Sequence, residues 1–424
     1  MAIIPADMSV HVVLSKIRIF VAILLLGSSL GCSSQSRGGS RGYEGSGVRG
    51  YENSDSCGDA DSIFAPLHPR TPASSNIKDT LTFAFVGDIM MGTTFPSRML
   101  PADEGRNLFR DAKDILSRAD IAAGNLEGTL CDGGQTKKKV SSICYAFRTP
   151  TSYSHLLKEA GFDFLGMANN HANDFGLEGI VSTEKELDAM GIGRAGIAGR
   201  QEYAILEIRG DDVTEVHRDE NSNPASTHPR TSTPSIRVGF CAFGHNSYTI
   251  THTDTANVSR ILKKLRSQVD LLVVCFHGGA EGAKASHLPQ GKELFLGENR
   301  GSLRQFAHQC IDLGADIVYG HGPHVPRCIE LYNDKLIAYS LGNFCTPKSV
   351  SLKGISGYAP LLEVKVDGEG RFLEGKIHSF IQQPAIGPRL DGQHRAAQLI
   401  RDLSASDIAR PQLTISSSGD IRRR

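Results

Sequence analysis

Residues 81–88 read Leu-Thr-Phe-Ala-Phe-Val-Gly-Asp, an apolar run of β-forming residues that stops at a carboxylate. Short apolar runs that end at side chains able to bind a metal occur five times along the chain. The other four are Ile121–Ala123 before Gly124–Glu127, Phe164–Ala168 before Asn169–His171, Leu271–Phe276 before His277, and Ala315–Tyr319 before Gly320–His324. Buried strands separated by helices predict an α/β fold, in which ligands bind outside the carboxyl ends of the strands. The five strand ends are therefore expected to converge on one pocket.

Five helices are predicted between these strands, because apolar residues recur there at three- and four-residue spacing. They cover Leu108–Ala119, Tyr153–Ala160, Leu177–Met190, Val258–Gln268 and Leu303–Leu313. Gly161, Gly191 and Gly314 follow three of these helices directly, which is typical of C-terminal caps. The alternation of strand and helix is predicted to continue to about Phe344.

The first 79 residues have the composition of an export segment and a tether. Lys16 and Arg18 precede the apolar stretch Ile19–Gly27, which predicts a secretory signal over residues 1–32. Cys32 lies in a Leu-Gly-Cys-Ser sequence close to the cleavage box of bacterial lipoproteins, so it is a candidate for lipidation. Residues 33–79 are rich in Gly and Ser and predict a disordered tether. We expect an exported protein, either membrane-anchored on the extracytoplasmic side or soluble in the periplasm.

The remaining sequence predicts one folded domain over residues 80–384, with a polar insertion near 211–234 and a C-terminal extension over 385–424. The tail from about Leu390 shows no clear strand-then-helix continuation. The formal net charge is zero, from 46 acidic and 46 basic residues, so no global field favours nucleic acid as a partner. The nine cysteines form no Cys-x-x-Cys pair, which argues against a thiolate zinc site. Cys131 and Cys144 flank a polar loop and are the predicted disulfide in an oxidising compartment.

The strand ends offer oxygen and nitrogen ligands without sulfur, a donor set that suits Mn, Fe, Zn or Mg. Asp88 follows Gly87, where the backbone can turn tightly. Asn169–His171, with Asp174 close behind, place an amide oxygen and an imidazole in one turn, which combines a ligand with a proton donor. Taken singly, each of these side chains could instead satisfy its own backbone. The strongest local signal is Gly320–His324, which holds two imidazoles.

These segments occur in the order found in CapA-type poly-γ-glutamate capsule biosynthesis proteins, and the chain resembles that family. The matching segments are Gly87–Met90, Asn125–Glu127, Asn169–His171, His277–Glu281, Gly320–Val325 and Tyr339–Phe344. The family in turn resembles the calcineurin-like metallophosphoesterases. The resemblance implies a four-layer α/β sandwich of two mixed β-sheets flanked by helices, with a dinuclear metal centre in the parent superfamily.

The resemblance also implies roles for individual side chains. The implied metal ligands are Asp88, Glu127, Asn170, His277, His321 and His324, with Glu127 in the place of the bridging carboxylate. His171 would face the substrate as a general acid or a charge stabiliser. The candidates for binding substrate or supporting these groups are Asn125, Asn169, Asp174 and Glu281, of which Glu281 could also be a rim residue.

Three positions depart from the related motifs. Met90 stands where the metallophosphoesterase motif has a histidine, and a thioether is a poor ligand for a hard cation. The implied cofactor is therefore one divalent ion or two. Gly278 and Gly282 replace a Trp and a Tyr of the CapA-type motif, which predicts a wider site or substrate contacts from other residues.

Two functions from different classes follow from these residues. The first is an exported metal-dependent hydrolase that acts on a phosphoester, or on an amide or ester bond of an anionic cell-surface polymer. The second is a membrane-tethered, non-catalytic accessory of a polymer-synthase complex, which binds the polymer directly or through one metal. A degenerate phosphoesterase fold that serves only as an interaction module is a third.

Overall fold

The computed structural model of the chain describes residues 79–136, 138, 145–210, 212–216, 235–348 and 350–424. All of them belong to one compact unit, Thr71–Arg424. The predicted signal, the tether up to residue 78 and the lipidation at Cys32 lie outside the described residues. Cys144 lies outside them too, so the predicted disulfide with Cys131 stays a prediction.

Among the described residues, the larger of two mixed sheets has ten strands. These strands are β1 (Thr80–Ile89), β2 (Ile121–Leu126), β5 (Phe164–Gly166), β6 (Gly193–Ala195), β16 (Asn343–Cys345), β17 (Tyr358–Asp367), β18 (Phe372–Gln383), β19 (Gly387–Leu390), β20 (Leu413–Ile415) and β21 (Asp420–Arg423). Their order is β20-β21-β18-β17-β1-β2-β5-β6, with β16 beside β1 and β19 beside β18. β1, β2, β5 and β6 run parallel, so their carboxyl ends lie at one edge of the sheet.

The second sheet has seven strands within the described part of the chain. These are β7 (Tyr203–Arg209), β8 (Asp212–Glu215), β9 (Ile236–Phe243), β10 (Leu271–His277), β13 (Ile317–His321), β14 (Ile329–Tyr332) and β15 (Lys335–Ala338), in the order β14-β15-β13-β10-β9-β7-β8. The central strands β9, β10 and β13 run parallel, and His277 pairs with His321 at their ends. Two short ribbons lie apart from the sheets: β3 (Thr129–Leu130) with β4 (Arg148–Thr149), and β11 (Glu293–Phe295) with β12 (Glu298–Gly301).

The described α-helices are α1 (Lys113–Arg118), α2 (Ser154–Ala160), α3 (Gly176–Ala189), α4 (Thr255–Arg266), α5 (Leu303–Asp312) and α6 (Arg395–Asp407). Four of the five predicted helices match α2 to α5 within a few residues. The helix predicted from Leu108 begins only at Lys113. Before Lys113, backbone N–H groups donate to the carbonyl oxygen three residues earlier, as in a 3₁₀-helix. The three glycines predicted as caps have positive φ, between 62° and 100°.

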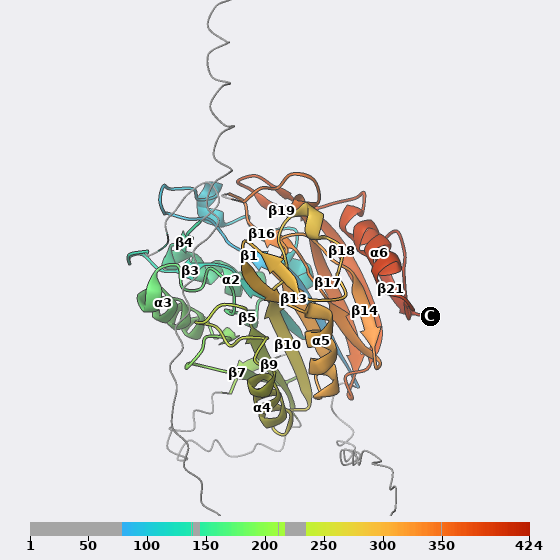
Figure 1. Cartoon of the computed structure of the whole chain (residues 1–424). Coiled ribbons are helices and arrows are strands. Elements are labelled where there is room, and N and C mark those ends of the chain that lie inside the picture. Colours follow the sequence, from blue (N-terminus) through green and yellow to red (C-terminus); the bar gives the residue numbers. More distant parts are fainter. Residues whose placement is uncertain (1–78, 137, 139–144, 211, 217–234, 349) are drawn as a thin grey trace, which may run out of the picture. The chain divides into compact units, whose positions relative to one another are not determined.

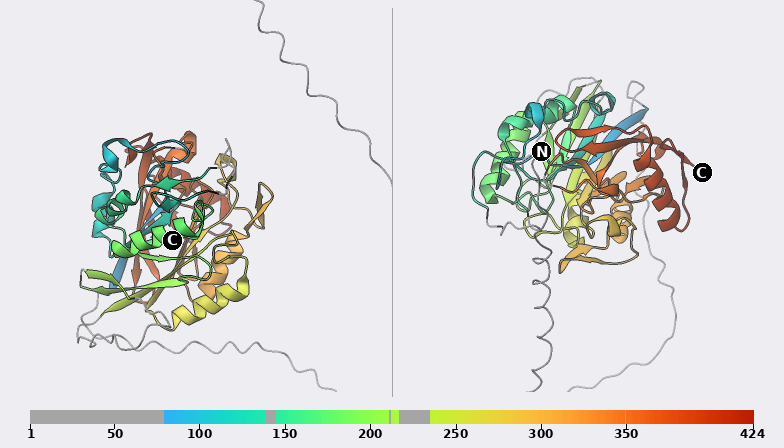
Figure 2. Two further views of the ribbon diagram at one scale, coloured as in Figure 1. Left: turned by 90° about the vertical axis from the view of Figure 1, so that its left-hand side faces the viewer. Right: turned by 90° about the horizontal axis from the view of Figure 1, so that it is seen from above.

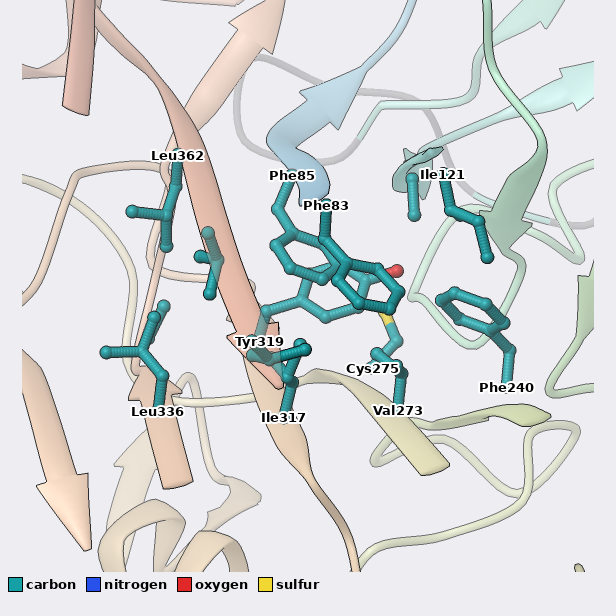
Figure 3. Packing of buried hydrophobic residues seen from close by; sticks show 14 of the residues in the cluster. Phe83, Phe85, Ile121, Phe240, Val273, Cys275, Ile317, Tyr319, Leu336 and Leu362 are labelled. Atoms are coloured by element: carbon teal, nitrogen blue, oxygen red, sulfur yellow. The ribbon is translucent and has the colours of Figure 1, made fainter. Parts of the chain in front are cut away.

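The two sheets pack face to face, and alternate side chains of β1 point to opposite faces of its sheet. Phe83 and Phe85 enter the cluster between the sheets, where the ring centroid of Phe85 lies 4.5 Å from that of Tyr319 (Figure 3). Ala84 and Val86 face the cluster that contains α1, α2 and α3. Helices α4 and α5 cover the outer face of the second sheet. This is the predicted α/β arrangement of two mixed sheets flanked by helices.

The C-terminal residues 385–424 add to this architecture. Strand β19, helix α6 and the hairpin β20–β21 follow one another, and β19 and β21 pair with β18. After Leu390 the order is α6 and then the hairpin β20–β21, so the expectation of no strand-then-helix continuation there is met, although these short strands were not predicted. Figure 1 and the two further views in Figure 2 place α6 and α3 on opposite sides of the sheets.

The polar insertion predicted near 211–234 begins with an edge strand. β8 pairs antiparallel with β7, while residues 217–234 lie outside the description.

Among the helices of the described residues, none combines the length and the apolar character that a membrane crossing requires.

Candidate metal centre

The carboxyl ends of strands from both sheets position the candidate ligands. Asp88 lies at the end of β1, where it pairs with Asn125 of β2 and Asn343 of β16. The glycine before it is required, because a Cβ at Gly87 would lie 2.0 Å from the carbonyl oxygen of Gly342. His277 ends β10 in the opposite sheet. The sandwich therefore brings ligands of the first sheet against ligands of the second.

Asp88, Glu127 and His324 form a group whose ligand atoms all lie within 4.8 Å of one another. Nδ1 of His324 lies 3.1 Å from Oδ2 of Asp88, and its Nε2 lies 3.6 Å from Oε1 of Glu127. His277 lies against the same two carboxylates, with each ring nitrogen 3.9 Å from one of them. The side chain of His324 is 18% exposed and the other three are at most 3% exposed.

Several buried polar atoms around this group lack a partner. Among the described residues, Oε1 of Glu127, Nε2 of His277 and Oδ1 of Asn170 accept or donate no hydrogen bond. A buried polar atom without a partner costs free energy, and such atoms are rare in folded proteins. A cation beside Glu127 and His277 would satisfy both of their open atoms. Carboxylate oxygens with imidazole nitrogens are a donor set for Mn, Fe or Zn, so these residues fit a divalent metal.

The charges of the group act on one another. Burial raises the pKa of Glu127 well above its usual range, and the neighbouring Asp88 raises it further. Burial alone would lower the pKa of His324, but Glu127 and Asp88 outweigh it and raise that pKa to about 10. The His324 imidazolium thus offsets charge on the two carboxylates. Because metal ligands bind in their deprotonated form, a cation would compete with this proton.

The ring of His321 does not join this group. Nε2 of His321 lies 3.0 Å from the carbonyl oxygen of Val86, and its Nδ1 lies 3.3 Å from that of Phe276. The ring therefore links β13 to backbone of β1 and β10. Asn170 has its open Oδ1, and its backbone oxygen accepts from Lys138. Met90 is buried, and its sulfur accepts a hydrogen bond from Gly92 N–H.

A chain of amides connects Asp88 to the loop after β5. Nδ2 of Asn125 donates to Oδ1 of Asp88 at 2.8 Å, and Oδ1 of Asn125 accepts from Nδ2 of Asn169 at 3.1 Å. Oδ1 of Asn169 then accepts from the backbone N–H of His171. Such contacts fix the orientation of a ligand and of the loop beside it. Asn125 and Asn169 therefore support the site.

His171 is held by Asp174. Nδ1 of His171 lies 2.9 Å from Oδ2 of Asp174, so the imidazole donates its proton there and leaves Nε2 open. Burial lowers the pKa of His171, although Asp174 acts in the opposite direction. Lys138 forms an ion pair with Asp174 and donates to the backbone oxygen of Asn170. Sequence reasoning missed Lys138, because a run of three lysines in a polar loop gives no sign of which one turns inward.

Three further polar residues lie at the rim. Oε1 of Glu281 accepts from Nη1 of Arg300 at 2.9 Å, and Nε of Arg300 donates to Glu298. At Gly278 the site is not widened, because a Cβ there would lie 2.8 Å from Nε2 of His252. At Gly282 no described atom lies within 4 Å of such a Cβ, so that position is open.

His245 was also missed by the sequence reasoning. Its side chain is 2% exposed, and its ring is stacked near that of His277 with centroids 5.9 Å apart. Burial lowers the pKa of His245 to about 4, and the Arg300 charge acts in the same direction. A signal was present, because the apolar strand β9 also ends just before an imidazole.

Comparisons with known proteins give relatives of the chain and a solved structure that is similar to it. The PGA biosynthesis protein CapA of Bacillus subtilis is 27% identical over 299 residues, which cover 69% of this chain and 70% of that relative. The capsule biosynthesis protein CapA of Bacillus anthracis is 28% identical over 297 residues, which cover 66% of this chain and 64% of that relative. The solved structure of the calcineurin-like phosphoesterase YfkN from Bacillus subtilis aligns with 77% of this chain and 97% of its own, at 14% identity and a TM-score of 0.40.

A family model described as bacterial capsule synthesis protein PGA_cap matches residues 82–348. This range contains every strand end of the candidate metal centre and well over half of the 424 residues. The chain therefore belongs to the PGA_cap family of bacterial capsule synthesis proteins.

Proposed function

We propose that this protein is an exported or membrane-tethered, metal-dependent hydrolase of capsule or poly-γ-glutamate biosynthesis. Its substrate would be a phosphoester, or an amide or ester bond of an anionic cell-surface polymer. Family membership supports the biological process. The chemistry is supported by one observation: Glu127 and His277 have open, buried ligand atoms beside Asp88 and His324.

Asp88, Glu127 and His324 would hold the cation, and His277 would be a further ligand. When bound, a divalent cation polarises a phosphoryl or carbonyl oxygen and supplies a nucleophilic water at neutral pH. Asn125 holds the Asp88 carboxylate in place through its 2.8 Å hydrogen bond. Burial of these carboxylates in a site of low dielectric strengthens their attraction for a cation.

His171 would move the proton. Its Nδ1 is committed to Asp174, so Nε2 can exchange a proton with the substrate. A phosphoryl group bound beside it would bring negative charge, which favours the protonated imidazole that a general acid requires. Asp174 fixes the tautomer of the imidazole, as a carboxylate does when it orients a histidine.

A second function is supported by Met90. Its sulfur already accepts from Gly92 N–H at 3.3 Å, at the position where the related phosphoesterase motif has a histidine ligand. These residues therefore fit one ion better than two. A single ion could hold a carboxylate of the polymer without turnover, as a non-catalytic accessory within a polymer-synthase complex would require.

Metal content and turnover together test the proposal. We expect the full chain to bind Mn²⁺ in equilibrium dialysis and to hydrolyse bis(p-nitrophenyl) phosphate only when the ion is present. Asp88→Asn should weaken Mn²⁺ binding by about 10-fold or more, because it removes a charged ligand. Ion binding without turnover would support the accessory function, and the absence of both ion binding and a thermal shift would refute the hydrolase.

Glu363→Gln is the matched control. Glu363 is also a carboxylate beside an imidazole, since its Oε2 lies 2.7 Å from Nε2 of His378, but Arg118 completes its contacts. This variant should bind Mn²⁺ as the unmodified chain does. An equal loss of binding in both variants would show that the effect of Asp88→Asn is not local to the candidate metal centre.

A further inference from the structure

The loop after β9 places a second pair of polar groups next to the candidate metal centre. β9 pairs parallel with β10, and Phe243 lies opposite Phe276, so His245 follows the strand end beside that of His277. Glu298 reaches the same place from the hairpin of β11 and β12. We call His245 and Glu298 the acceptor pair.

The hydrogen bonding of His245 leaves the acceptor pair incomplete. Its Nδ1 lies 3.4 Å from the carbonyl oxygen of His277. A carbonyl oxygen can only accept, so this hydrogen bond requires the proton on Nδ1, which leaves a lone pair on Nε2. Nε2 lies 3.6 Å from Oε2 of Glu298, which is too long for a hydrogen bond. Among the described residues, Nε2 has no hydrogen-bond partner. Two acceptors thus face each other, and a group with several N–H donors could satisfy both.

We propose that His245 and Glu298 bind an ammonium group of the substrate beside the candidate metal centre. This inference rests on the proposed function and adds a substrate class to it. The substrate would be an amine-bearing building block or polymer of the cell surface. The ring of His245 is stacked near that of His277, with centroids 5.9 Å apart. The ring of His245 would therefore lie between the ammonium group and the proposed ligand His277.

The surrounding charges favour a cation over an anion. Arg300 donates to both Glu298 and Glu281, so one guanidinium faces two carboxylates and the set retains a negative charge. The acceptor pair offers two ligand atoms, whereas divalent metals in proteins take four or more. An ammonium group has three N–H donors and can be bound by two acceptor atoms. The side chain of Glu298 is 51% exposed and that of His245 is 2% exposed, so an ammonium group would approach the pair from the side of Glu298.

A titration of the full chain tests this inference without metal or turnover. The side-chain nitrogens of ¹⁵N-histidine-labelled protein are followed by NMR while ethylammonium is added, with the His245 signals assigned from His245→Gln. We expect a saturable shift of the His245 Nε2 signal. Tetramethylammonium carries the same charge without an N–H donor and should not produce that shift. The absence of any saturable shift with ethylammonium, or an equal shift with both ions, would overturn the inference.

Two exposed glutamates provide the variant and its control. Glu298→Gln should abolish the shift, while Glu369→Gln removes the same charge from a side chain that is 61% exposed and pairs with Arg371, and should retain it. Loss of the shift in both variants would mean that the binding of ethylammonium depends on the overall charge of the protein, which also overturns the inference.

A pair of phosphates separates this inference from the proposed function. On the Mn²⁺-loaded chain, 2-aminoethyl phosphate should bind about 10-fold more tightly than ethyl phosphate, because it adds charge-assisted hydrogen bonds. Equal affinities would refute the ammonium site and leave the metal site standing. If neither phosphate binds, the phosphoester form of the proposed function fails, and the ethylammonium titration still decides the ammonium site.

Discussion

Arg327 and Glu293 form one group of buried charges, and the ligands of the candidate metal centre form another. The side chain of Arg327 is fully buried, and its two terminal nitrogens donate to the two oxygens of Glu293 at 2.9 and 2.7 Å. Its Nε donates to the carbonyl oxygen of Ala285, and Glu293 also accepts from Ala280 N–H. In contrast, Glu127 and His277 keep open atoms among the described residues.

The difference shows that burial of charge does not by itself mark a functional site. A buried ion pair whose hydrogen bonds are complete leaves nothing for a ligand to satisfy. The Arg327–Glu293 pair joins the segment between β13 and β14 to the hairpin of β11 and β12, and both side chains also contact the loop that follows β10. The pair therefore holds structure together. In the candidate metal centre, buried polar atoms lack hydrogen-bond partners. A bound ligand can offset the free-energy cost of burying them.

The largest expected effect tests the structural half of this comparison. Arg327→Leu would leave Glu293 buried without its partner, which should lower the free energy of unfolding by about 3–5 kcal/mol in urea denaturation. The double variant with Glu293→Leu should recover much of this loss, because it removes the unpaired charge as well. A loss of less than about 1 kcal/mol in the single variant would mean that the pair behaves like a surface ion pair.

The next effect tests the functional half. His171→Gln should lower kcat for bis(p-nitrophenyl) phosphate by about 100-fold or more, since it removes the proton-exchanging group. Mn²⁺ content should be unchanged, because His171 is not among the grouped ligands. The control is His155→Gln, the same change at a side chain that is 51% exposed. Unchanged turnover in His171→Gln would remove His171 from the mechanism.

The smallest effect concerns pH. Hydrogen bonds from His378 and from Arg118 together lower the pKa of Glu363 to about 2, against burial. A lowered pKa means that the native state binds fewer protons, so this stabilisation is present above pH 4.5 and is lost as the pH falls toward 2. After allowance for solvent screening, Glu363→Gln should remove about 1 kcal/mol of that pH dependence in urea denaturation at a series of pH values.

The open carboxylate should behave in the opposite way. The pKa of Glu127 is raised by burial and by Asp88, so its contribution to stability is present at low pH and is lost as the pH rises. If Glu363 and Glu127 showed pH dependences of the same sign in metal-free protein, the distinction between satisfied and open carboxylates would fail.

Much of the fold was predictable because its signals are local. Short apolar runs located five of the strands, apolar residues at three- and four-residue spacing located four of the helices, and glycines marked three helix ends. The C-terminal hairpin of β20 and β21 was not predictable, because strands of three or four residues depend on their pairing with β18. The same applies to β8, which is an edge strand within a polar segment.

The types of side chain in the candidate site were predictable from the sequence, but which of these side chains meet was less so. Asp88, Glu127, His277 and His324 were expected to converge, and the structure brings them together. His321 pairs with His277 in register, yet its ring nitrogens face backbone oxygens. Spacing along the chain could not distinguish the two histidines, because the difference lies in what the opposite sheet presents to each ring.

The sequence by itself determined which residue types stand at the strand ends, since strand periodicity and donor chemistry depend on neighbouring residues alone. Only the tertiary structure decided which of these donors meet. Sheet packing sets Asp88 of one sheet against His277 of the other, and it brings His245 to Glu298 from a hairpin some fifty residues further along the chain. These contacts depend on register and layer packing, which are long-range properties that local sequence patterns do not encode.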